Sequence, residues 1–150
     1  MSREVKPIKE KIERAVRLLR RNDLFLLVND SDEWAISHKL AEYLQKEFLD
    51  WHVDVEYNRD KDQIKTLDEE KVRPDIIVHI RNTDSNLLVV EVKKSNNLDY
   101  VYLDKERLKK FTSLEGKYKY NIGLLAIFYV ANESHKEPIR QYYEKGEQVE

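Results

Sequence analysis

The sequence contains no cysteine, which excludes disulfides, thiolate zinc sites and cysteine nucleophiles. Glycine and proline occur three times each, so there is no flexible linker, and we expect one domain over residues 1–150. No apolar run reaches the ~20 residues that a membrane span requires. The charged first 21 residues also lack the apolar centre of a signal peptide. We therefore expect a cytoplasmic protein that makes no membrane contact.

Neither sign of charge is in large excess, since 27 lysines and arginines accompany 29 aspartates and glutamates. A protein that coats nucleic acid in general would be strongly basic, so this class is excluded. The four histidines, His38, His52, His79 and His135, have neither HExxH nor HxH spacing. A zinc hydrolase is therefore not favoured.

The apolar residues recur with helical spacing in some segments and with strand spacing in others. We expect helices at residues 7–21, 33–49, 104–112 and 138–145, and strands at residues 51–58, 74–80, 87–93 and 122–130. Asp104 is the expected cap of the third helix. Residues 59–73 are predicted to form a loop. Residues 24–28 are compatible with either a helix or a strand. The order indicates an α/β class with an α+β-like mixed sheet.

Two of the expected strands carry charges where aliphatic residues are usual. Asp75 opens the strand at 74–80, and Glu91 and Lys93 lie near the end of the strand at 87–93. Glu91 and Lys93 share one face because side chains alternate across a strand. The turn-rich NTDSN segment predicts an antiparallel hairpin, which brings Asp75 beside them. The alternative is a surface hairpin with an ordinary ion network, but the apolar context favours a site.

Two carboxylates and one ammonium group would thus converge at one end of the sheet. Two neighbouring carboxylates repel each other, and a hard cation such as Mg2+ relieves that repulsion through oxygen ligands. Bound Mg2+ polarises a phosphoryl oxygen and lowers the pKa of a water molecule. A nearby lysine stabilises developing negative charge. The set is therefore suited to hydrolysis of phosphodiester bonds.

Pro74-Asp75 followed by Glu91-Val92-Lys93 resembles the signature of the PD-(D/E)XK nuclease superfamily, which includes restriction endonucleases, archaeal Holliday junction resolvases and repair nucleases. The stretches SHKLAEYLQ, DVEYNRD and PDIIVHIR are also similar to small bacterial proteins of that superfamily. The resemblance implies a restriction-endonuclease-like α-β-β-β-α-β core over about residues 33–130, with an extra N-terminal helix and a short C-terminal helix. It implies that Asp75, Glu91 and the Val92 carbonyl bind Mg2+, for which Mn2+ substitutes. It also implies that Lys93 is the catalytic lysine.

The superfamily often adds a glutamate from the helix that precedes the sheet. In the helix expected at residues 33–49, Glu33 falls within the apolar stripe, whereas Glu42 falls on the opposite side and Glu47 lies near the far end. We expect Glu33 to be a metal-side or water-positioning acid. The other interpretation is that Glu33 has no role in the site, and that an acid stands at this position only because the helix dipole favours negative charge there.

The expected partner is nucleic acid, and in the first place DNA. Lys94, Lys109 and Lys110 are the expected backbone contacts, since cations near such a site position phosphates without reading sequence. A homodimer is a further expectation because one small domain covers little DNA. Two alternatives remain open: a catalytically silent module that binds nucleic acid or protein, and a defence component that needs a partner chain.

Overall fold

The computed structural model describes residues 4–60 and 63–150, and it centres on a six-stranded sheet. In spatial order the strands are β1 (His52–Val55), β6 (Ile76–His79), β7 (Asn86–Lys94), β8 (Ile122–Phe128), β9 (Ile139–Glu144) and β10 (Glu147–Val149). Only β7 and β8 pair in parallel, and the other neighbours are antiparallel. The predicted mixed sheet of α+β type is therefore confirmed.

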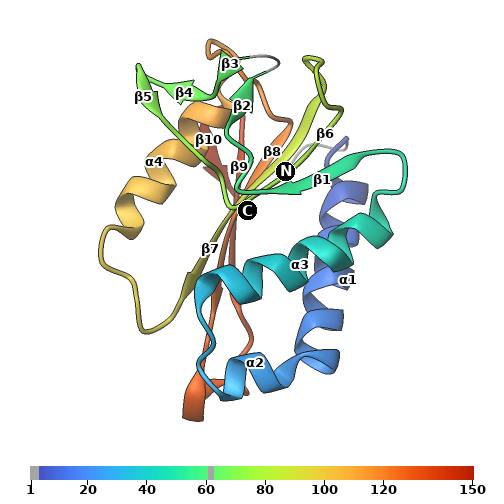
Figure 1. The fold of residues 1–150 in the computed structure, drawn as a ribbon, viewed down its shortest axis with the longest axis vertical. Helices are drawn as coiled ribbons and strands as arrows, with labels where there is room; N and C mark the ends of the chain where they lie inside the picture. The colour runs from blue at the N-terminus through green and yellow to red at the C-terminus, as the bar shows by residue number, and fades with distance from the viewer. Residues whose placement is uncertain (1–3, 61–62) are drawn as a thin grey trace.

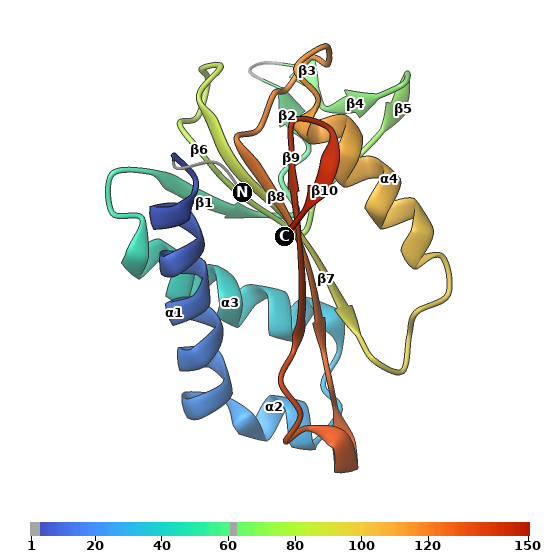
Figure 2. The ribbon, with the colours of Figure 1, turned by 180° about the vertical axis from the view of Figure 1, so that it is seen from behind.

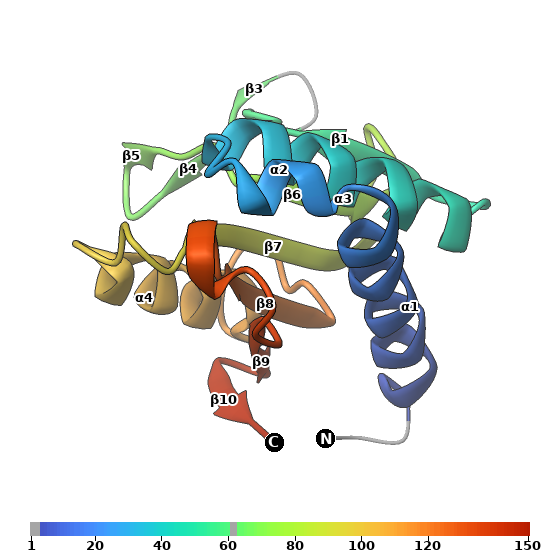
Figure 3. The same ribbon diagram turned by 90° about the horizontal axis from the view of Figure 1, so that it is seen from below.

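Helices cover both faces of this sheet. In the described parts of the chain they are α1 (Lys6–Asn22), α2 (Leu24–Val28), α3 (Glu33–Glu47) and α4 (Val101–Thr112), with a 3-10 turn η1 (Ala131–Glu133). Figure 1 shows α4 on one side and α1 with α3 on the other, and Figure 3 shows β7 between α3 and α4. None of these helices is both long and apolar enough to cross a membrane.

The sheet has a separate apolar core on each face because its strands alternate. In β7, Val90 and Val92 pack on the side of α1 and α3, whereas Val89 packs on the side of α4. Strand β8 is buried along its whole length, as is typical of a strand whose residues are all apolar. The parallel pairing of β7 and β8 requires a long crossover, which α4 provides.

The hairpin that carries the predicted site forms as expected. Strands β6 and β7 pair antiparallel with Ile76 opposite Val90 and Ile77 opposite Val89. Helix α3 begins directly after Asp32, whose carboxylate accepts the N–H of Ala35 at 2.8 Å. These two elements fix the positions of the hairpin end and of the α3 N-terminus.

The helix predicted at residues 138–145 is wrong, because this segment forms β9 and then turns back as β10 (Figure 2). Tyr142 is buried on the α1 face and Tyr143 on the α4 face, so consecutive residues serve both cores as only a strand allows. Gly146, with φ of 83°, makes the turn into β10. Strand β9 also covers the edge that β8 would otherwise expose.

The other differences concern boundaries and the segment at 59–73. Residues 24–28 form the helix α2, which resolves that open assignment. Helix α4 starts at Val101, so Asp104 is not its cap but a buried residue of its first turn. The segment at 59–73 is not a plain loop in its described part. It contains the two-residue strands β2 (Arg59–Asp60), β3 (Gln63–Ile64), β4 (Thr66–Leu67) and β5 (Glu70–Lys71), paired as two hairpins.

A distant tyrosine anchors these short hairpins, which explains why local sequence did not predict them. The Tyr118 hydroxyl donates to the Thr66 carbonyl at 2.6 Å and accepts the Thr66 N–H at 2.9 Å. The Lys65 ammonium lies 4.3 Å from the centre of the Tyr118 ring. The order of this segment therefore depends on contacts 52 residues away in the chain.

Candidate active site

The end of the β6–β7 hairpin joins the two acids that the sequence singled out. Asp75 directly precedes β6, and its Oδ2 accepts the backbone N–H of Val92 at 2.7 Å. The strand register extends by one residue to place Asp75 opposite Glu91. The predicted proximity of Asp75 and Glu91 is therefore confirmed.

Burial changes the acidity of both carboxyl groups. Burial raises the pKa of Asp75 from 3.8 to about 6, although the N–H of Val92 and a hydrogen bond with Glu91 act in the opposite direction. Glu91 is only 6% exposed, and burial, reinforced by the negative charge of Asp75, raises its pKa well above the usual value. The pair is therefore stable near neutral pH when a proton or a cation lies between its oxygens.

Lys93 lies on the same face as Glu91 and meets an acid from α4. Its Nζ is 3.2 Å from Oδ2 of Asp104, which is buried and forms a second ion pair with Arg107 at 3.1 Å. Burial lowers the pKa of Lys93, but the charges of Asp104 and Glu33 outweigh burial and leave it raised. Lys93 is therefore a cation at neutral pH.

Asp104 is a site residue that sequence reasoning missed, since it was expected to cap a helix. A signal was present in the spacing of α4. Asp104, Leu108 and Phe111 recur at intervals of four and three residues, which places them on one face of the helix. That face packs on the sheet and buries all three side chains.

Glu33 connects the start of α3 to the end of β7. Its Oε2 accepts the backbone N–H of Lys94 at 3.1 Å and the side-chain amide of Asn97 at 3.2 Å. Glu42 is exposed on the far side of α3 and pairs with Lys39 at 3.3 Å. The predicted orientation of these two glutamates is therefore confirmed.

One pocket of about 330 Å3 contains all four predicted side chains. Glu33, Glu56, Lys71, Val72, Arg73, Pro74, Asp75, Glu91, Lys93, Asp104, Arg107 and Phe111 line it. Glu56, Lys71 and Arg73 come from the segment between β1 and β6, where no spacing in the sequence indicated a site. Both acidic and basic side chains line this pocket, so it could accommodate a cation together with a phosphate group.

The three predicted nucleic-acid contacts lie outside the lining of this pocket. Lys94 points to the α3 side of the sheet, because it follows Lys93 in the strand, and pairs with Asp30 at 2.9 Å. Lys109 pairs with Glu106 at 3.2 Å, and Lys110 pairs with Asp68. Their contact with nucleic acid stays a prediction.

The donor atoms at the hairpin end fit a hard cation. Asp75 and Glu91 supply carboxylate oxygens, and Val92 supplies a carbonyl. In an antiparallel pair the N–H and C=O of one residue point to the same neighbour, so this carbonyl points, like the N–H, toward Asp75. When the β6–β7 register is continued, Pro74 lies opposite Val92. Because proline has no N–H, Pro74 cannot donate a backbone hydrogen bond to the Val92 carbonyl.

Within residues 4–60 and 63–150, no group of three or more His, Asp or Glu side chains has the geometry of a metal site. Asp75, Glu91 and the Val92 carbonyl could hold a cation together with water, and such a set of oxygen donors suits Mg2+.

No model of a known protein family matches this chain, and no curated protein gives a significant match.

Proposed function

We propose that the protein is a metal-dependent nuclease that hydrolyses phosphodiester bonds of nucleic acid, and in the first place of DNA. The observation that carries this proposal is the convergence of Asp75, Glu91 and Lys93 in one polar pocket. The order α3-β1-β6-β7-α4-β8 supports a restriction-endonuclease-like core, since it matches the α-β-β-β-α-β succession once the short strands at 59–71 are set aside.

In this proposal Asp75, Glu91 and the Val92 carbonyl hold Mg2+, or Mn2+ in its place. When bound by these residues, the cation would supply Lewis-acid polarisation of a phosphoryl oxygen and a water molecule of lowered pKa. The Lys93 ammonium stabilises the negative charge that develops on the phosphoryl oxygens. Glu33 accepts a proton or a hydrogen bond from water in this scheme, which is supported by its place in the pocket lining and by the use of only one of its oxygens, Oε2, in the bonds to Lys94 and Asn97.

Asp104 acts in this scheme through Lys93 and is a positioning residue. Its buried carboxylate fixes the ammonium at 3.2 Å and keeps it protonated. Arg107, held by the same carboxylate at 3.1 Å, places a guanidinium group on the pocket wall. A guanidinium group binds phosphate oxygens in a bidentate manner, so Arg107 suits the substrate phosphate.

The test is cleavage of a panel of single-stranded, duplex and branched DNA and RNA with Mg2+ or Mn2+. Lys93→Ala is expected to lower the rate at least ~100-fold, as removal of one charge-stabilising donor does. Lys105→Ala is the matched control, because it makes the same change, lysine to alanine, at a position outside the pocket. Lys105 lies on α4, the helix that carries Asp104. EDTA should stop cleavage by every variant. Cleavage that survives Lys93→Ala would contradict the mechanism.

A catalytically silent binding module is the second candidate, and one observation favours it. The charges of Lys93 and Glu33 are already satisfied within the chain, by Asp104 and by the Lys94 N–H. Titration calorimetry with Mg2+ separates the two candidates. Mg2+ binding that disappears in Asp75→Ala supports the nuclease. Nucleic-acid binding without any metal affinity supports the silent module, and metal binding without cleavage indicates a nuclease that needs a partner chain.

A further inference from the structure

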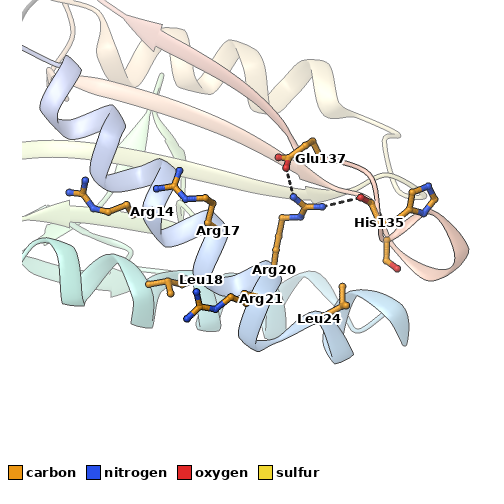
Figure 4. Close-up of a pocket in the computed structure, with 9 residues that line it drawn as sticks. Arg14, Arg17, Leu18, Arg20, Arg21, Leu24, His135 and Glu137 are labelled. Carbon is orange, nitrogen blue, oxygen red and sulfur yellow. Dashed lines mark hydrogen bonds and ion pairs between the residues drawn. The ribbon is translucent and has the colours of Figure 1, made fainter.

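A second pocket, of about 620 Å3, lies beside α1, and it shares no lining residue with the candidate active site. It is formed by the second half of α1, the start of α2 and the segment that leads into β9 (Figure 4). Its lining residues are Arg14, Arg17, Leu18, Arg20, Arg21, Leu24, Ser134, His135 and Glu137. Four arginines and one acid therefore line a cavity whose volume exceeds that of the candidate active site, and one of these arginines, Arg14, pairs at 2.8 Å with Glu47, which lies outside the lining.

The one acid of this pocket does not neutralise the arginines. Glu137 pairs with Arg20 and also with Arg140 at 3.0 Å, so two guanidinium groups already share its carboxylate. Arg20 also donates to the carbonyl of His135 at 3.0 Å, as Figure 4 shows. These contacts hold Arg20 as a fixed part of the wall.

Arg17 and Arg21 differ from the other two arginines of the pocket. Arg17 and Arg21 are exposed, and neither makes a side-chain hydrogen bond or ion pair within the part of the chain that the structure describes. They are four residues apart on α1, so their Cβ atoms lie about 6 Å apart on one side of the helix, and like charges at this spacing repel each other. The helix dipole favours a cation in the last turn, which accounts for Arg21 but not for Arg17. A bound anion would relieve this repulsion.

The chemistry of the wall selects among anions. Arginine binds phosphate in a bidentate manner and also stacks its planar face on aromatic rings, whereas an acidic peptide needs only charge. Leu18 and Leu24 add apolar surface to the same lining, against which the sugar of a nucleotide can pack. We propose that this surface, the α1 arginine pocket, binds the phosphate backbone of a nucleic-acid strand.

The α1 arginine pocket goes beyond the proposed catalysis, because α1 and α4 lie on opposite faces of the sheet. A strand bound here makes its contacts independently of the acids around Asp75. Its binding therefore needs neither metal nor an active catalytic site, and it can be measured in EDTA.

The experiment is fluorescence anisotropy of a labelled single-stranded oligonucleotide with the whole protein in EDTA, over a series of KCl concentrations. Arg17→Ala/Arg21→Ala is expected to reduce the slope of log K against log salt by about 1.4, because each lost phosphate contact removes about 0.7 for a single strand. Lys6→Ala/Lys46→Ala is the matched control, since it also removes two exposed positive charges from helices but lies outside the pocket. This control should keep the wild-type slope.

Three results would overturn the proposal. The first is an equal slope for the arginine variant and its lysine control, which would mean that only net charge matters. The second is displacement of the oligonucleotide by polyglutamate at the same charge concentration, which would indicate an acidic protein partner. The third is displacement by inorganic pyrophosphate at a lower charge concentration than unlabelled oligonucleotide, which would indicate a small phosphate ligand. Circular dichroism spectra that match the wild type show that each variant is folded.

Discussion

Asp75→Asn is expected to stabilise the folded protein at neutral pH while it removes the proposed metal ligand. Burial raises the pKa of Asp75 from 3.8 to about 6. In the wild type, ionised Asp75 therefore lies in a pocket that disfavours its charge. An asparagine at this position keeps a carbonyl oxygen for the Val92 N–H, and its amide can donate to Glu91.

The rise in pKa sets both the size and the pH range of this effect. Below pH 3.8 Asp75 is protonated in the folded and the unfolded chain, so it costs no stability. Between pH 3.8 and about 6 the unfolded chain releases a proton that the folded chain retains, and stability falls as pH rises. Above that range the cost is constant at roughly 3 kcal/mol. This is an upper value, because Asp75 and Glu91 titrate as a pair.

Urea unfolding of wild type and Asp75→Asn at pH 4 and at pH 7.5, both in EDTA, measures the effect. We expect the variant to be more stable by about 1–3 kcal/mol at pH 7.5 and nearly equal to the wild type at pH 4. In thermal unfolding at pH 7.5 this corresponds to a rise in Tm of roughly 3–9 °C for a chain of this size. Added Mg2+ should narrow the difference, because only the wild type keeps both carboxylates.

The control is Asp50→Asn, which removes an equal charge from an exposed position. It should change the free energy of unfolding by less than about 0.5 kcal/mol at either pH. A destabilised Asp75→Asn at pH 7.5, or a gain of the same size at both pH values, would refute the reasoning. In either case Asp75 would not be a buried acid whose charge the fold disfavours.

Two further variants test the surroundings of the site. Asp104→Asn should lower the cleavage rate and move the alkaline limb of the pH–rate profile to lower pH, because Asp104 helps to raise the pKa of Lys93. An alkaline limb at the wild-type pH would show that Asp104 does not act through Lys93. Gly123→Ala should cost about 1–3 kcal/mol of stability, since a Cβ there would lie 3.2 Å from Thr112 and 3.3 Å from Leu108. An unchanged urea midpoint would show that α4 and β8 can separate to admit a methyl group.

The sequence predicted the candidate site where the relevant geometry is local. Asp75 and Glu91 belong to strands joined by a short turn, so the period of two and the turn together place them opposite each other. The same alternation put Glu91 and Lys93 on one face. Glu33 followed from helical periodicity, which is equally local. Each of these inferences needs only a few neighbouring residues.

The prediction from the sequence was wrong where a residue far along the chain decides the secondary structure. Residues 138–145 carry apolar spacing that fits a helix, but strand β8 offers them an edge and two apolar cores. That edge is part of a sheet whose order is set by pairing across the whole chain. Tertiary pairing therefore overrides local propensity there.

By itself the sequence determined a mixed sheet between helices and a hairpin that joins two acids to a lysine. Only the tertiary structure decided which side chains complete the candidate active site and the α1 arginine pocket. Asp104 reaches Lys93 because α4 packs across the face of β7. Glu137 reaches Arg20 because β9 returns beside α1, 117 residues along the chain. Periodicity specifies the face on which a side chain lies, whereas the partner on that face is fixed only when distant elements pack together.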